Sequence, residues 1–187
     1  FFFKYIYVGF FYVSFLDVFL FTLIICSFCK SAQFGFHFWL PDSMEAPVPA
    51  SALIHSATLV SAGIYLLLRF NYLFFFSPNL FNVFLSITSF TAFFGALISS
   101  YQTDVKKILA YSTISHCGFL MVSIGLFNPF ISILYLFGHG FYKSLNFICC
   151  GNLIQHANNY KDNKKKLKFK ISKGLFLNYF VKIFSER

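Results

Sequence analysis

The chain has 187 residues, of which 58% are hydrophobic and only 11% are charged, and its mean hydropathy is +0.69. Soluble globular domains carry about 25% charged residues, and one small domain lacks the volume to bury this much apolar surface. These values exclude a soluble enzyme and predict a membrane protein. Because one transmembrane helix needs about 20 apolar residues, the length allows five or six spans and a short tail.

The net charge of +9 is concentrated at the C-terminus. Residues 157–187 contain nine Lys or Arg and two acidic residues, a net charge of +7. A basic surface for nucleic acid would be spread over a folded domain, so we expect no nucleic-acid partner. The positive-inside rule places this tail on the cytoplasmic or matrix side. Its basic residues suit anionic lipid headgroups, with cardiolipin as a candidate.

The first 40 residues are apolar apart from Lys4, Asp17 and Lys30, and two helix registers fit them. One span runs from residue 5 to 29, and the alternative span runs from 17 to 40. We favour the second register because it places Asp17 at a helix N-terminus, where a carboxylate is stabilising. It also places Lys30 deep inside the membrane.

The later spans are separated by proline and by short polar links. Prolines 41, 47 and 49 predict a turn, since they cannot all lie inside one regular helix. We expect further spans at residues 48–70, 79–101, 105–127 and 130–153. The predicted fold is therefore an all-α polytopic membrane helix bundle. Its predicted parts are an N-terminal remnant of a preceding helix at residues 1–16, a membrane domain of about five transmembrane helices at 17–156, and a basic tail at 157–187.

Ionisable side chains within these spans are the first functional candidates, because each costs about 2.5 kcal/mol or more at a helix centre. Lys30, His55, His139 and Lys143 are the deepest. Tyr135 precedes His139 by four residues and Lys143 by eight, so the three share one helix face. Histidine titrates near neutrality, and a buried lysine can change its charge state. This combination predicts a proton relay.

Other polar residues support the same prediction. Ser51 and Thr58 lie on one helical stripe with His55, and His116 follows Ser112 by one turn. An alternative role for each histidine is a hydrogen bond between helices. Lys106, near a helix end, can also snorkel to the headgroups.

A helix break is predicted directly after Lys30, where small and polar residues and Gly35 follow at once. Transporters place such breaks where backbone groups line a cavity. The alternative is a continuous helix that tolerates Gly35.

The five cysteines do not predict a metal or redox site. Cys26 and Cys29 form a C-x-x-C pair, but within an apolar helical run and without a partner pair. We interpret all five as structural thiols.

Three motifs carry a resemblance to a known family. They are KSAQFGFHFWLPDSMEAP at 30–47 with its continuation PASALIHSATLV at 49–60, TDVKKILAYSTIS at 103–115, and HGFYKSL at 139–145. Their order and spacing resemble the chain 5 family of antiporter-like subunits in respiratory complex I, the proton-pumping NADH:ubiquinone oxidoreductase. The resemblance covers roughly residues 17–156.

The resemblance implies part of an antiporter-like bundle of inverted repeats with a helix broken near Lys30. By the same resemblance, Lys30 is the lysine at the break, His55 is the histidine on the next helix, and Lys106 and Lys143 lead across the membrane with His139. The implied function is proton translocation coupled to electron transfer from NADH to ubiquinone. The implied location is the mitochondrial inner membrane, with the tail on the matrix side. No cofactor is expected in this chain, since flavin, iron–sulfur clusters and ubiquinone belong to other subunits.

The departures from the family are equally informative. Family members are about three times longer, so the expected partners are other membrane-arm subunits, including a companion chain with the missing helices. One missing helix carries the glutamate that pairs with Lys30. Tyr135 stands where the family usually has a second histidine, and a tyrosine does not titrate near neutrality.

Two alternative functions remain at this point. The first is the large subunit of a multi-subunit sodium/proton antiporter, whose sequence around Lys30 is closely related. The second is a structural bundle fragment without its own proton path.

Overall fold

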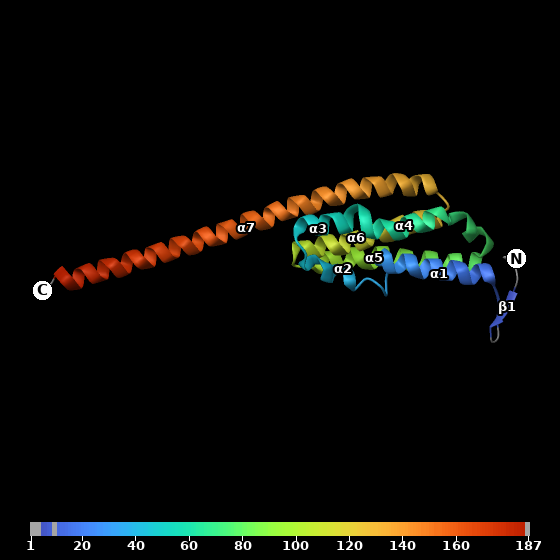
Figure 1. Ribbon diagram of the computed structural model, residues 1–187, viewed down its shortest axis with the longest axis horizontal. Helices are drawn as coiled ribbons and strands as arrows, with labels where there is room; N and C mark the ends of the chain where they lie inside the picture. Colours follow the sequence, from blue (N-terminus) through green and yellow to red (C-terminus); the bar gives the residue numbers. More distant parts are fainter. Residues whose placement is uncertain (1–4, 9–10, 186–187) are drawn as a thin grey trace. The chain divides into compact units, whose positions relative to one another are not determined.

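The computed structural model describes the backbone of residues 5–8 and 11–185, and the side chains of residues 14–161 except residue 57. The chain divides into two compact units, Phe1–Ile148 and Cys149–Arg187. The first unit contains the helix bundle (Figure 1). The two units are therefore described separately.

The chain begins with a short antiparallel hairpin. Strand β1, Tyr5–Val8, pairs with strand β2, Phe11–Ser14, in a register that sets Tyr5 opposite Ser14. The predicted helical remnant is wrong for these residues. The reason is local, because both segments are built from aromatic and β-branched residues, which favour an extended backbone.

Helix α1, Phe15–Lys30, starts at a capping box. The Asp17 backbone N–H donates to Ser14 Oγ at 3.1 Å, and the Asp17 carboxylate accepts from the Ser14 backbone N–H at 3.3 Å. This pair of bonds satisfies N–H groups that a helix start leaves unpaired. It selects the second of the two predicted registers, in which Asp17 lies in the first turn.

Helix α1 ends at Lys30, where the sequence predicts an interruption. Ala32 and Gly35 adopt positive φ angles of 51° and 92°, which lie in the left-handed region that a helix excludes. Helical structure resumes in α2, Trp39–Asp42, and continues in the 3-10 turn η1, Ser43–Glu45. The Trp39 indole N–H donates to the Cys29 carbonyl at 3.1 Å and ties the two sides of the break together.

The next helical segment contains a π-helical turn. Helix α3, Val48–Leu53, leads into the π turn η2, Ile54–Thr58, and then into helix α4, Leu59–Arg69. A π turn adds one residue to the turn and shifts every later side chain around the helix axis. Accordingly, Thr58 Oγ1 donates to the carbonyl of Leu53, five residues earlier, at 2.8 Å.

The remaining helices follow the predicted spans closely. The 3-10 segment η3, Asn71–Phe76, leads to α5, Pro78–Tyr101, and α6, Val105–Gly125. Helix α7, Pro129–Ser185, is longer than the predicted span and continues through the second unit, including most of the predicted basic tail. In the first unit α1, α4, α5 and α6 run alongside one another (Figure 1).

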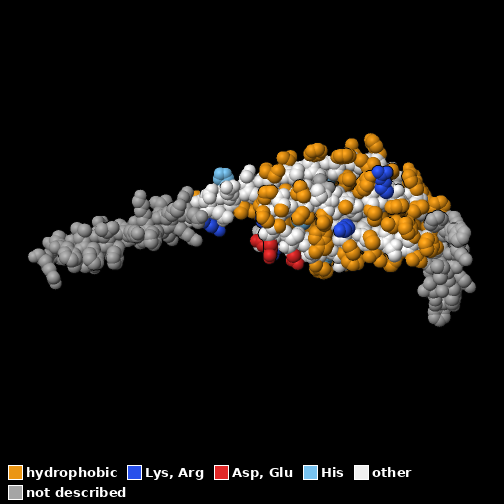
Figure 2. All heavy atoms as spheres, in the orientation of Figure 1, with side chains coloured by type: hydrophobic (Ala, Val, Ile, Leu, Met, Phe, Trp, Pro, Cys, Tyr) orange, Lys and Arg blue, Asp and Glu red, His pale blue; other side chains and the backbone are white. Residues whose placement is uncertain are grey.

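Three helical segments of the described chain are long and apolar enough to cross a membrane. They are Val48–Arg69, Pro78–Tyr101 and Val105–Gly125. The prediction of about five spans is thus confirmed for three, and spans at α1 and at the first part of α7 stay a prediction. Hydrophobic side chains cover the visible face, and acidic side chains gather near the end that carries α2 (Figure 2).

Small residues bring α5 and α6 into close contact. A Cβ atom on Gly118 would lie 2.6 Å from the Ala92 backbone nitrogen, and one on Gly95 would lie 2.8 Å from that of Ser115. Ser115 Oγ also donates to the Ala92 carbonyl at 2.8 Å across the same contact. Close backbone approach of this kind drives helix association in membranes, where burial of apolar surface contributes little.

We predict that Gly118→Leu separates α5 from α6 and destabilises the subunit by about 1–3 kcal/mol or more, because the added side chain has no space. The measurement is the thermal denaturation temperature of the detergent-solubilised protein. Gly138→Ala is the matched control, since nothing lies within 4 Å of its added Cβ. Equal denaturation temperatures for both variants would contradict the close contact.

Candidate functional site

The buried amine of Lys143 is the most unusual feature of the bundle. Its side chain is 1% exposed, although it lies within a helix of largely apolar sequence. Lys143 Nζ donates to Ser112 Oγ of α6 at 2.6 Å and lies 5.9 Å from the centre of the Tyr142 ring. Among the described residues no carboxylate pairs with it. A neutral hydroxyl is therefore the main polar support of this amine.

An imidazole cluster lies next to Lys143 along the α6–α7 contact. His116 Nδ1 is 2.5 Å from the Tyr135 hydroxyl, and the His116 and His139 ring centres are 5.6 Å apart. The face shared by Tyr135, His139 and Lys143 therefore meets α6, as their spacing predicts. His116 adds a second imidazole to this face from the neighbouring helix.

A hydroxyl pair extends the polar contact toward the α6–α7 turn. Ser123 Oγ and Ser132 Oγ are 2.8 Å apart, and Ser132 Oγ also donates to the Asn128 carbonyl at 3.0 Å. On α7 the polar residues run from Ser132 to Lys143, which is about 16 Å at 1.5 Å per residue. We call this row of groups between the two helices the polar seam.

The π turn places His55 in the core beside the polar seam. The His55 side chain is fully buried, with its ring 5.8 Å from that of Phe147. His55 Nε2 lies 3.0 Å from Ser43 Oγ. The backbone of Ser56, the next residue of the π turn, lies close to His139. The π turn therefore lies next to the polar seam.

Each of these two histidines keeps one buried nitrogen without a hydrogen-bond partner in the described chain. The atoms are Nδ1 of His55 and Nε2 of His139. An unpaired buried polar atom costs about 1–3 kcal/mol, so its presence in a folded protein calls for an explanation. Both atoms are positioned to exchange a hydrogen bond or a proton with water or with a moving group.

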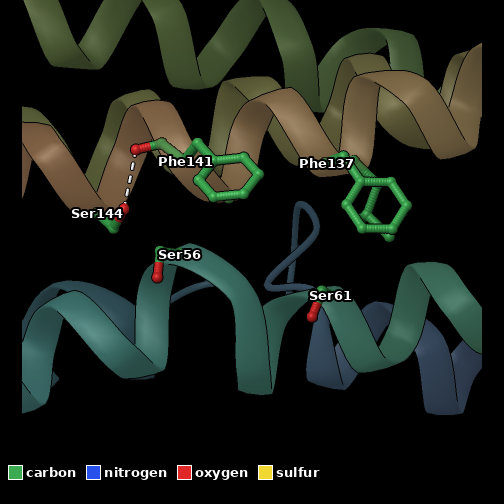
Figure 3. A pocket seen from close by; sticks show the side chains of 7 residues that line it. Ser56, Ser61, Phe137, Phe141 and Ser144 are labelled. Carbon is green, nitrogen blue, oxygen red and sulfur yellow. Dashed lines mark hydrogen bonds between the residues drawn. The ribbon is translucent and has the colours of Figure 1, made fainter.

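A cavity of about 370 Å³ lies between the π-turn segment and α7. In Figure 3, Ser56 and Ser61 come from one wall, and Phe137, Phe141 and Ser144 come from the facing helix. Leu136 and Gly140 complete the lining. The lining is mostly apolar, and its polar groups are the three serine hydroxyls.

Lys106 lies at the end of the bundle rather than in the polar seam. It is half-buried in the first turn of α6, and its Nζ donates to the carbonyls of Met44 at 3.2 Å and Ala46 at 3.1 Å. The proline-rich turn and the start of α6 therefore lie at the same end of the bundle. The Lys106 amine is held there by two backbone carbonyls.

Lys30 is not brought together with the other predicted site residues. Its side chain is exposed at the end of α1, where its Cβ lies near Gly63 of α4. No described element covers that side of the break, and the depth of Lys30 in the membrane stays a prediction.

The supporting residues on the His55 stripe separate in the structure. Ser51 is buried and donates to the carbonyls of Ala46 at 3.4 Å and Pro47 at 3.3 Å. Thr58 is exposed. The π turn lies between them and rotates Thr58 away from the face that a regular helix would give it.

Sequence reasoning missed two polar contacts that the structure places in the core. The first is the contact between Ser43 and His55. In the second, Thr91 Oγ1 of α5 donates to Gln33 Oε1 at 2.6 Å, and the side chains of Thr91 and Gln33 are both fully buried. A glutamine directly after a predicted helix break was a usable signal. Ser43 gave none, because its contact depends on how the turn folds.

The described residues do not bring three metal-ligating side chains together. Cys26 and Cys29 are free and exposed on α1. The chemistry available at the site is therefore that of an amine, imidazoles and hydroxyls.

Comparison with known proteins gives a consistent result. The model of the family "NADH:quinone oxidoreductase/Mrp antiporter, TM" matches residues 3–180. NADH-ubiquinone oxidoreductase chain 5 of Paramecium tetraurelia is 52% identical over 165 residues, which is 88% of this chain and 29% of that protein. Chain 5 of Pongo abelii is 43% identical over 143 residues, 76% of this chain and 24% of that protein.

A solved structure shares the fold. A chain in the structure of the Mrp complex from Dietzia sp. DQ12-45-1b aligns with a TM-score of 0.68 at 40% sequence identity, covering 71% of this chain and 15% of that one. The present chain thus spans less than a third of the length of these relatives. The family match covers nearly the whole sequence, and the chain belongs to the NADH:quinone oxidoreductase/Mrp antiporter transmembrane family.

Proposed function

We propose that this chain is part of a membrane-arm subunit of respiratory complex I and takes part in proton translocation coupled to electron transfer from NADH to ubiquinone. The family match and the chain 5 relatives support this assignment. The observation that carries it is the buried Lys143 amine, bonded to Ser112 beside the His116–His139 pair. A purely structural bundle has no need for this arrangement, since a buried charge costs several kcal/mol.

Lys143 acts as a proton store whose charge state depends on its surroundings. Coulomb interactions are strong in a medium of low dielectric constant. A charge that arrives or leaves nearby therefore changes whether the amine holds a proton. The Ser112 hydroxyl accepts from the amine at 2.6 Å and donates its single proton to the Leu109 carbonyl at 2.8 Å, so this contact supports the protonated amine.

From Lys143 the proposed path runs along the polar seam. His139 and His116 are the titratable groups of this path, and Tyr135 holds His116 by its hydroxyl. We propose that His116 of α6 supplies the imidazole in place of the second histidine that the family usually has at the position of Tyr135. His55, on the neighbouring π turn, would be the next imidazole of the path.

Lys30 and Lys106 are the outer members of the proposed path. The exposed face of Lys30 would be covered by a segment of the longer relatives that this chain does not span, including the glutamate implied by the resemblance. Lys106 lies at the end of the bundle that we assign to the matrix side. Ser51 and Thr58 would support the path as polar neighbours of His55. Ser51 lies one helical turn before His55, and Thr58 lies on the outer surface.

The remaining assignments follow from the same proposal. The fold would be part of the inverted-repeat antiporter bundle, with α1 and α2 as its broken helix. The proposed division is a membrane domain at 17–156 preceded by residues 1–16 and followed by a basic matrix-side tail at 157–187. The partners would be other membrane-arm subunits in the mitochondrial inner membrane and anionic lipid, with flavin, iron–sulfur clusters and ubiquinone in other subunits.

A sodium/proton antiporter subunit is the second candidate. The Dietzia Mrp match favours it, since 40% identity and a TM-score of 0.68 are substantial. The higher identity to the Paramecium chain favours complex I. Co-purification with flavin- and iron–sulfur-containing subunits would support complex I, whereas purification without them, as part of a cation antiporter, would support the alternative.

We predict that Lys143→Met lowers proton pumping at least tenfold, because methionine fills the space of lysine but carries no proton. Pumping is measured as protons per electron and as rate in the assembled complex, reconstituted in vesicles. Lys107→Met is the matched control, since Lys107 is half exposed and pairs at the surface with Asp104. Unchanged pumping in Lys143→Met, in a complex that assembles normally, would leave the structural role as the better explanation.

We also predict that Tyr135→Phe lowers the pumping rate roughly two- to tenfold, which corresponds to the loss of one hydrogen bond to His116. Tyr135→His should retain most of the rate, because an imidazole can take the place of the hydroxyl. The same assay serves, and Tyr101→Phe is the control at an exposed position. An equal loss of pumping rate in Tyr135→Phe and Tyr135→His would contradict a role for the hydrogen bond between residue 135 and His116.

A further inference from the structure

One turn of the chain contacts two of the proposed proton-carrying residues. In η1 and the residue after it, Ser43 contacts His55, while the carbonyls of Met44 and Ala46 accept from Lys106 Nζ. His55 and Lys106 come from different helical segments, and in the described part of the chain no hydrogen bond joins them directly. The turn from Ser43 to Ala46 therefore provides the connection between them.

The direction of the Ser43–His55 hydrogen bond follows from proton counting. Ser43 Oγ donates to the Leu40 carbonyl at 2.6 Å, and a hydroxyl has a single proton to donate. At 3.0 Å the bond to His55 must therefore be donated by the Nε2–H of the imidazole. In the neutral ring the lone pair is then on Nδ1, the nitrogen that has no partner in the described chain.

The position of Ser43 is fixed from both sides. Leu40 and Met44 are buried in the core, with exposed fractions of 0% and 4%. The two bonds from Lys106 add a charged donor to carbonyls on the C-terminal side of Ser43, and hydrogen bonds from a charged donor are about twice as strong as neutral ones. A change in the charge of Lys106 therefore acts directly on the turn that carries Ser43.

We propose that Ser43 is a positioning residue for His55 and that Lys106 holds it in place through the carbonyls of Met44 and Ala46. Ser43 presents the unprotonated Nδ1 of His55 to an incoming proton, and Lys106 controls how firmly it does so. Removal of the Lys106 amine takes away two hydrogen bonds to the turn and loosens the imidazole ring of His55. The turn thus connects the position of the Lys106 amine to the orientation of the His55 ring.

The effect of Ser43 on proton pumping rests on the proposed function, but the contact between Ser43 and His55 can be tested separately. The first measurement is the ¹⁵N resonance of the His55 ring in the labelled, assembled complex, which responds to the partner of Nε2. We expect Ser43→Ala and Lys106→Met each to shift the Nε2 resonance. Ser86→Ala is the matched control, since its exposed hydroxyl bonds only to its own helix. Unshifted resonances in both test variants would overturn the proposal.

The second measurement is the pumping rate of the same complexes. We expect Ser43→Ala to lower it roughly two- to tenfold, as for the loss of one hydrogen bond, and Ser43→Thr to restore it, because threonine keeps the hydroxyl. If Ser43→Ala does not assemble, Ser43→Cys replaces it, since a thiol has similar size and is a weaker partner. Full pumping in Ser43→Ala, or an equal loss in Ser43→Thr, would overturn the positioning role.

A double-mutant cycle tests the part played by Lys106. If Lys106 acts through the turn, Ser43→Ala should have little further effect on pumping in a Lys106→Met background. Additive losses would overturn the coupling. Lys143→Met separates the two proposals: unchanged pumping there, together with shifted His55 resonances, would reject the proposed function and retain the connection between Lys106 and His55.

Discussion

The hydrogen bond from Lys143 to Ser112 is the interaction on which the arrangement of the site depends. An ammonium group cannot remain unpaired in an apolar interior, so α7 must lie with this face against α6. That placement brings Tyr135 onto His116 and His139 beside it. Helix α6 is in turn fixed by its close contact with α5 at Gly118. The packing of small residues on one side of α6 therefore positions the polar residues on its other side.

Departures from regular helix matter as much as the helices themselves. In a membrane a backbone group that leaves the helical ladder needs another partner. The π turn at Ile54–Thr58 provides such a case, because the Thr58 hydroxyl donates to the Leu53 carbonyl. The break after Lys30 is likewise closed by the bond from Trp39 to the Cys29 carbonyl. Each irregularity brings a polar side chain to the bundle interior or to its edge.

Long apolar segments bounded by proline and polar residues were predictable from sequence, as the close agreement for α5 and α6 shows. The face of α7 was also predictable, because a spacing of four residues is preserved in any regular helix. The exposure of Thr58 was not, since nothing local signals a π turn. Nor was the role of Ser43, whose two partners come from distant parts of the chain. Spacing predicts which residues share a face, whereas contacts across turns depend on tertiary packing.

The contrast between the two deep lysines indicates where this chain meets the rest of its assembly. Lys143 is enclosed by its own bundle, whereas Lys30 ends α1 with its side chain exposed. A charged lysine side chain that faced lipid at the predicted depth of Lys30, without a counter-ion, would destabilise the protein by several kcal/mol. We therefore expect the Lys30 side of α1 to be a protein interface that supplies a carboxylate. Under the proposed function, the exposed face of Lys30 and the enclosed polar seam would be two parts of one path.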